Sequence, residues 1–148
     1  MNTPTLQFSD VPRDWALCFQ HDCPLVAFCL RHHAATLAPA DLRKHNCVLP
    51  GARTGDGRCA LFVEDKPVRM ARGMETMLRG WSQWDAMPVR HALEGVFGSR
   101  AQYYRYRSGR WPVTPHQQQR VAAVFRRYGI TAEPHYDRIT EEYFFPRD

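Results

Sequence analysis

Apolar residues recur at helical spacing in the second half of the chain. Five of them fall on one face of a helix that would begin at Met70: Met70, Met74, Met77, Leu78 and Trp81. Such a stripe is typical of core packing. A second helix is predicted to begin near Pro88, because proline is favoured in the first helical turn. It would end at Gly98 after burying Val89, Ala92, Leu93, Val96 and Phe97. These patterns predict two consecutive core-facing helices.

Two further helices carry capping signals. Ser99 can cap the free amides of a helix that ends at Gly109, where a left-handed conformation is needed. Thr114 and Gln117 have the spacing of a capping box, and Pro115 fits the first turn of the same helix. That helix is predicted to stop at Gly129 after burying Val121, Val124 and Phe125.

The first half of the chain is less regular. We predict one short helix ending before Pro39, a glycine-rich loop over residues 49–59, and a small hairpin with a strand at 60–63 and a turn at 65–67. The resulting organisation has four parts: a cysteine-rich metal-binding segment (1–48), a loop with a short hairpin (49–69), a helix-turn-helix-like bundle (70–130), and an acidic aromatic tail packed on the body (131–148).

The charge of the chain changes this picture because it is concentrated. The 148 residues carry a formal net charge of +5, and the segment from Asp85 to Ile130 holds eight arginines against two acidic residues. Clustered positive charge attracts phosphate backbones. The alternative is a solvated face in a protein that uses arginine for nearly all its cations.

The basic segment has the layout of a helix-turn-helix, whose second helix lies in the major groove. "SRAQYYRYRSG" resembles the recognition helix of the phage-repressor-like class, and Ser99, Tyr103, Tyr106 and Gly109 match that spacing. The resemblance implies that Tyr103 and Tyr106 face the core. The residues expected to contact nucleic acid are Arg100, Gln102, Tyr104, Arg105, Arg107, Arg110 and Arg120. The turn at Gly98 and Ser99 is about one residue shorter than usual, which could shift the outward set by one.

Three cysteines within twelve positions indicate a second kind of site. The spacing is Cys18-x4-Cys23-x5-Cys29, with His33 four residues further on and Cys59 beyond the glycine-rich loop. Four sulfur or nitrogen donors make a zinc site, with either His33 or Cys59 as the fourth ligand. With Cys59 the all-cysteine set also suits a [4Fe-4S] cluster. A buried, merely apolar Cys29 is the structural alternative, and Cys47 is expected to be a spare thiol.

The order of motifs along the chain resembles a family of small bacterial proteins known as a domain of unknown function. The features that carry this likeness are "CP" at Cys23-Pro24, "CLR" at Cys29 to Arg31, and "YYRYRSG" at Tyr103 to Gly109. The lone cysteine of the family pattern corresponds to Cys59, so the resemblance favours Cys59 over His33 as the fourth ligand. It brings no known activity.

These observations predict a mainly α protein, in which a helix-turn-helix-like bundle and a short β-hairpin accompany an N-terminal cysteine-rich metal knuckle. We expect a cytoplasmic DNA-binding regulatory protein with a structural zinc or a redox-sensing cluster, in which duplex DNA is the partner. A homodimer is compatible with this interpretation. The alternative is a metal-stabilised module that binds protein or RNA. Enzymatic activity is not expected, because the sequence offers no acid–base pair or phosphate loop. No membrane association and no small-molecule substrate are indicated.

Overall fold

The computed structural model of the chain describes residues 3–148 and separates into two compact units. We call Met1–Pro67 together with Tyr143–Asp148 the cysteine unit, and Val68–Glu142 the helical unit. Each unit has its own cluster of buried apolar side chains.

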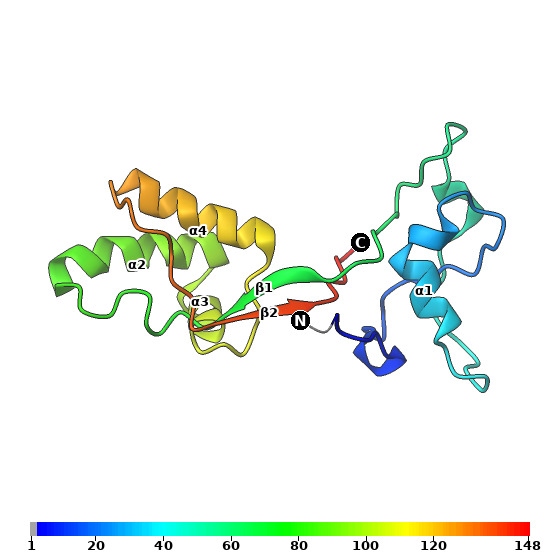
Figure 1. The fold of residues 1–148 in the computed structure, drawn as a ribbon, viewed down its shortest axis with the longest axis horizontal. Coiled ribbons are helices and arrows are strands. Elements are labelled where there is room, and N and C mark those ends of the chain that lie inside the picture. The colour runs from blue at the N-terminus through cyan, green and yellow to red at the C-terminus, as the bar shows by residue number, and fades with distance from the viewer. Residues whose placement is uncertain (1–2) are drawn as a thin grey trace. The chain divides into compact units, whose positions relative to one another are not determined.

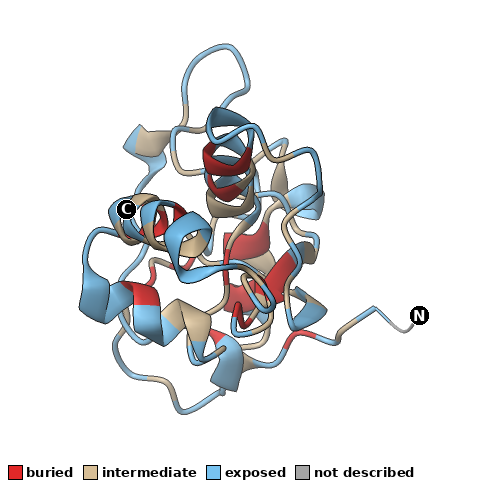
Figure 2. Cartoon of the chain, turned by 90° about the vertical axis from the view of Figure 1, so that its left-hand side faces the viewer, coloured by how far each residue is buried: buried red, intermediate tan, exposed pale blue. Residues whose placement is uncertain are grey.

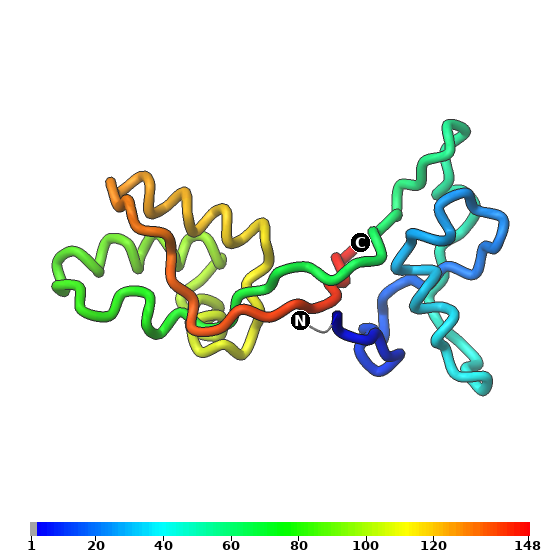
Figure 3. Tube along the Cα trace, viewed as in Figure 1, coloured from blue at the N-terminus to red at the C-terminus, as the bar shows by residue number. Residues whose placement is uncertain are grey.

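A two-stranded antiparallel sheet pairs the first and the last segment of the helical unit. Strand β1 (Val68–Arg72) pairs with β2 (Arg138–Glu142), and Met70 lies opposite Thr140. The tube in Figure 3 shows the two strands side by side, although all three helices of the unit lie between them in the sequence. The guanidinium of Arg72 donates to the carboxylate of Glu142 at 2.6 Å.

The predicted hairpin and the first predicted helix are therefore wrong. Residues 60–63 form no strand, and Met70 lies on β1 rather than at the start of a helix. Gly73, with φ of 81°, turns the chain after β1, and Met74 and Met77 follow in that turn. All three methionines are buried, and Met74 and Met77 belong to the core cluster of the helical unit. The helical spacing of these methionines therefore does not reflect a helix, because they lie on a strand and in a turn.

The three helices of this unit follow in order (Figure 1). Helix α2 (Gln83–Phe97) begins earlier than predicted, because Ser82 caps it by accepting from the amide of Asp85 at 3.1 Å. Pro88 therefore lies inside α2 instead of opening it. The predicted end at Gly98 is confirmed.

Helices α3 (Arg100–Arg107) and α4 (Pro115–Arg127) have the predicted caps. Ser99 accepts from the amide of Gln102 at 3.1 Å, and Gly109 has φ of 81°. Thr114 and Gln117 form the capping box that opens α4. Both caps depend only on residues within one helical turn, which is why the sequence predicts them.

The core of the helical unit lies where α2, α3, α4 and β1 meet. Its buried residues, red in Figure 2, include Ala71, Val89, Leu93, Phe97, Tyr103, Val113, Val121, Val124 and Phe125. Tyr106 stacks on Phe97 with ring centroids 4.4 Å apart. Tyr103 and Tyr106 thus face inward as expected.

From residue 3 onward, the cysteine unit contains one short α-helix, α1 (Leu30–Thr36), and three 3-10 turns at Phe8–Asp10, Val26–Phe28 and Pro50–Ala52. Its core includes Trp15, Leu17 and Leu30. Arg31 is only 2 % exposed, and it donates to the carbonyls of Leu61 and Ala16 and to the carboxylate of Asp148. Within residues 3–148, no helix combines the length and the apolar character needed to cross a membrane.

Candidate functional site

Four of the five cysteines line one cavity in the cysteine unit. These are Cys18, Cys23, Cys29 and Cys59, and the cavity measures about 20 Å³. Cys47 is exposed and does not line it, and all five thiols are free. The cavity therefore contains the all-cysteine set that the sequence favoured.

Each of these cysteines is held by a different local structure. The amide of Cys18 donates to the carbonyl of Arg31 at 3.1 Å, and Cys29 is the N-cap residue of α1. Cys23 accepts from the amide of Val26 at 3.1 Å and so begins a tight turn. Cys59 is paired with Arg53 across the glycine-rich loop. The thiols thus come together only because four separate backbone segments fold around the same space.

The histidines lie differently from what the sequence suggested. His33 is not part of the cavity wall, and its Nδ1 is 2.9 Å from a carboxylate oxygen of Asp65. His32, which the sequence did not single out as a ligand, lines the cavity, and its Nδ1 is 3.1 Å from the carbonyl oxygen of Cys18. Both histidines are about one helical turn after Cys29, so spacing alone could not distinguish them.

The electrostatics of the cavity combine half-buried thiols with nearby cations. Burial raises the pKa of the Cys18 thiol, a backbone hydrogen bond involving Gln20 opposes that rise, and the neighbouring cysteines add to it. Arg31 and Arg53 also line the cavity. Within residues 3–148, no three cysteine, histidine, aspartate or glutamate side chains form a ready-made metal site. The thiols would have to turn toward a common point to bind an ion.

The second candidate surface is the exposed side of α3 in the helical unit. Tyr104 lies between two guanidinium groups, with Arg100 at 5.7 Å and Arg107 at 5.5 Å from its ring centroid. Arg105 stacks on Trp111 at 4.8 Å. Aromatic rings therefore hold three of the predicted arginines in defined positions.

The remaining predicted contact residues are more scattered. Gln102 is exposed, but its side-chain oxygen lies so close to Gly98 that a Cβ there would be 2.6 Å away. Gln102 thus folds back over the turn that precedes α3. Arg110 is exposed in the loop after α3, and Arg120 is exposed on α4.

The arginines of this surface lack acidic partners. None of the five predicted arginines is within ion-pair distance of a carboxylate in residues 3–148; these are Arg100, Arg105, Arg107, Arg110 and Arg120. No acidic residue occurs between Glu94 and Glu133. The positive charge of this segment is consequently free to face a ligand.

One family model spans both units and matches residues 1–145. The chain belongs to DUF6078, a family of unknown function. No curated protein and no solved structure matches it. The expected membership of a domain-of-unknown-function family is confirmed, and function must be argued from the DUF6078 chain itself.

A second cavity in the helical unit was missed by sequence reasoning. It measures about 230 Å³ and is lined by Arg79, Arg90 and Arg107 together with Met74, Glu75, Leu78, Ala86 and Tyr103. Arg79 and Arg90 lie far from Arg107 in the sequence, and no motif links them. Only the packing of the turn after β1 against α2 and α3 brings these arginines of the DUF6078 chain together.

Proposed function

We propose that the protein is a DNA-binding regulatory protein whose helical unit contacts duplex DNA through α3 and whose cysteine unit binds a single zinc ion. The observation that carries the DNA part is the exposed face of α3, where arginines without acidic partners are held by aromatic rings. The zinc part of the proposal rests on a separate observation, the four cysteines that line the small cavity.

The charge distribution supports nucleic acid as the partner. The helical unit has twelve arginines and seven acidic residues, so the formal net charge of +5 of the whole chain belongs to this unit. Phosphate backbones bind such surfaces by releasing counterions. Arginine also pairs with guanine in the major groove, where each bidentate contact contributes roughly 1–3 kcal/mol of discrimination. Arg100 and Arg105 are exposed on α3, where both phosphates and bases are accessible to them.

Fluorescence anisotropy with pooled duplex DNA over a salt series tests the DNA proposal. Two phosphate contacts contribute about 2 to the slope of log K against log salt. We expect the double variant Arg100→Ala, Arg105→Ala to weaken binding and reduce this slope. The control is Arg13→Ala, Arg43→Ala, which removes the same charge from exposed positions of the cysteine unit. Equal slopes in the two variants, or no binding by the folded wild-type protein, would reject the proposal.

Single-stranded RNA is a second candidate because of one specific feature. Tyr104 is exposed and flanked by two guanidinium groups, and such a ring can stack on an unpaired base. A Tyr104→Leu variant that loses single-strand binding, in a protein without duplex binding, would favour this alternative over the DNA proposal.

The donor set suits zinc, and the small size of the cavity favours zinc over a cluster. Four cysteine sulfurs at about 2.3 Å satisfy tetrahedral zinc. A volume of about 20 Å³ is little more than the space that one water-sized probe needs, roughly 10–15 Å³, and a four-iron cluster with its sulfides needs much more. Zinc with four thiolates carries two negative charges. Arg31 and Arg53 line the cavity, and each is also paired with a carboxylate, that of Asp148 and that of Asp22 respectively.

Metal analysis of the purified protein tests the zinc site. We expect one zinc per chain in the wild type and in Cys47→Ser, whose exposed thiol lies outside the cavity, and loss of zinc in Cys59→Ser. His33→Gln should keep its zinc, because His33 is bonded to Asp65 outside the cavity. Retention of zinc in Cys59→Ser with loss in His33→Gln would instead assign the fourth ligand to His33. Iron and sulfide, together with visible absorption after anaerobic purification, would show that the site binds an iron–sulfur cluster instead of zinc.

A further inference from the structure

From the second cavity of the helical unit we infer a binding site for a small phosphate monoester, formed by Arg79, Arg90 and Arg107. Arg107 also lies beside Tyr104 on the α3 surface described above, but Arg79 and Arg90 are not among the proposed DNA contacts, and the site does not depend on Arg100 or Arg105. Its elements are the turn at residues 74–79, one side of α2, and the flank of α3.

The charges of the cavity match a dianion. Three guanidiniums and one carboxylate, that of Glu75, line it, which gives a net charge of +2. None of these three arginines is within ion-pair distance of an acidic group in the described part of the chain. A phosphate monoester carries about −1.5 to −2 at pH 7, whereas a carboxylate carries one charge. Guanidinium groups also bind phosphate oxygens in pairs.

A tyrosine adds to this lining. Tyr103 is only 2 % exposed as a whole residue, yet it lines the cavity. Burial raises the pKa of Tyr103, although Arg107 opposes that rise. The hydroxyl thus stays protonated at neutral pH and is available to donate to a phosphate oxygen.

The walls of the cavity are held in place before any ligand binds. The amide of Met74 donates to the carbonyl of Arg107 at 2.9 Å, which ties the turn to the end of α3. Asp137 accepts from the amides of Glu75 and Thr76 at 2.9 and 3.1 Å, which braces the same turn. A preorganised site loses less entropy when it binds.

The remaining lining residues and the volume of the cavity limit the size and polarity of the ligand. Met74, Leu78 and Ala86 provide an apolar wall beside the arginines. The volume of about 230 Å³ is below the range of roughly 300–1,000 Å³ that is usual for drug-sized ligands. The site therefore suits a phosphate group with a short carbon body.

Isothermal titration calorimetry of the full chain tests this site, with inorganic phosphate and glycerol 3-phosphate as probes and glycerol as the uncharged control. We expect saturable binding of one phosphate probe per chain and none of glycerol. Arg90→Gln and Arg79→Gln should each weaken binding about tenfold, the effect of losing one charged hydrogen bond. Arg127→Gln removes the same charge from an exposed position of α4 outside the cavity, and it should bind as the wild type does.

Several results would overturn the inference. The first is absent or non-saturable binding to the folded wild-type protein, and the second is equal weakening in Arg127→Gln. A third is weaker duplex DNA binding in the Arg79 and Arg90 variants without phosphate binding, because the cavity would then belong to a DNA surface. Arg79 is exposed in the turn, so Arg79→Gln remains informative if Arg90→Gln does not fold. A failure of the DNA proposal would leave these results unchanged.

Discussion

Arg31 shows at the residue scale how a single charged side chain can organise a small core. Its guanidinium lies 4.3 Å from the ring of Trp15 and donates to the carbonyls of Leu61 and Ala16 and to Asp148. A buried charge is tolerated only when it is paired and hydrogen-bonded. Here it connects the start, the middle and the end of the cysteine unit.

Replacing Arg31 by Met should therefore destabilise the protein strongly. The carbonyls of Leu61 and Ala16 would remain in place without their donors, and each unsatisfied buried group costs about 1–3 kcal/mol. We expect the free energy of unfolding of the cysteine unit to fall by about 3 kcal/mol, measured by urea denaturation under reducing conditions. Arg13→Met, at an exposed position, should change it little, and similar losses in both variants would contradict this role of Arg31.

Asp137 provides a pH-dependent contribution in the helical unit. Burial alone would raise its pKa, but hydrogen bonds from the Thr76 hydroxyl and from the amides of Glu75 and Thr76 outweigh burial and hold the pKa below the ordinary value of 3.8. Because the folded pKa is the lower one, the ionised carboxylate contributes stability above pH 3.8, and this contribution is lost as the pH falls through the folded pKa.

The comparison of the wild type with Asp137→Asn isolates this contribution. The difference in unfolding free energy should be constant near neutral pH and should shrink as the pH falls below 3.8, measured by urea unfolding at a series of pH values. The matched control is Asp41→Asn, at an exposed position of the cysteine unit. A difference that does not change with pH would show that the hydrogen bonds to Asp137 do not depend on its charge.

At the scale of elements, local signals and long-range contacts had different outcomes. The caps at Ser99 and Thr114 involve residues three positions away, so their prediction needed no tertiary information. The strand β1 was missed, because its partner β2 lies beyond all three helices of the unit. Buried Met70, Met74 and Met77 had the spacing of a helix, and only the turn at Gly73 distinguishes the observed strand from that helix.

Gly73 and Gly95 provide opposite tests of this local geometry. Gly73 has φ of 81°, and a Cβ there would overlap the side chain of Asp137. We expect Gly73→Ala to lower the free energy of unfolding by about 2 kcal/mol, since the left-handed conformation alone costs an L-residue about 1–2 kcal/mol. Gly95 lies within α2 with no atom within 4 Å of a new Cβ, so Gly95→Ala should stabilise the helix by about 0.5–1 kcal/mol. Thermal unfolding of both variants measures these changes, and a common sign would contradict the prediction.

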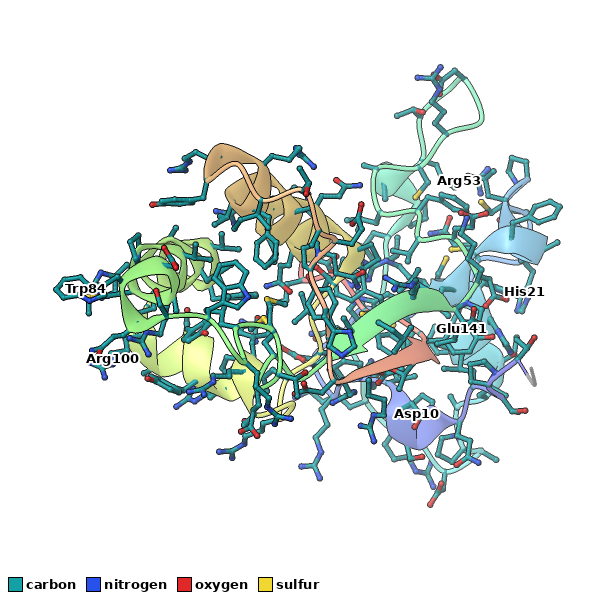
Figure 4. The ribbon with its side chains drawn as sticks, turned by 60° about the vertical axis from the view of Figure 1, so that its left-hand side comes forward. Asp10, His21, Arg53, Trp84, Arg100 and Glu141 are labelled. Atoms are coloured by element: carbon teal, nitrogen blue, oxygen red, sulfur yellow. The ribbon has the colours of Figure 1, made fainter. Side chains whose placement is uncertain are left out.

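Exposed aromatic side chains are also an element-scale feature that the sequence did not distinguish. Trp84, in the first turn of α2, is 86 % exposed, and Figure 4 shows it pointing away from the ribbon. The neighbouring Trp81 is partly buried against the core of the helical unit. A difference of three positions moves the side chain from the core to the solvent, because the helix begins only after Ser82.

At the scale of the whole molecule, the separate cores imply separate responses to metal removal. Each unit buries its own apolar cluster, and only the cysteine unit contains the proposed zinc ligands. An ion that binds only the folded state stabilises it by about 4 kcal/mol when present at a thousand times its dissociation constant.

We therefore expect a chelator to lower the unfolding temperature of the cysteine unit and to leave that of the helical unit unchanged. Calorimetry would report the transitions, and hydrogen exchange would assign them, with loss of protection in α1 but not in α4. Cys47→Ser should respond as the wild type does. An equal shift of both transitions would mean that the two units unfold as one, and no shift would mean that no structural metal is bound.

The sequence by itself determined what depends on neighbouring residues: the capped starts of α3 and α4, their glycine ends, and the inward faces of Tyr103 and Tyr106. It also indicated the cysteine set through spacing and family resemblance. Tertiary structure alone decided that Cys59 reaches the cavity of Cys18, that His32 rather than His33 lines it, and that Arg79 and Arg90 approach Arg107. Caps and helix faces are set by hydrogen bonds and periodicity within a few residues. Cavities and strand pairs are set by segments that meet only after the chain has folded, which no local pattern encodes.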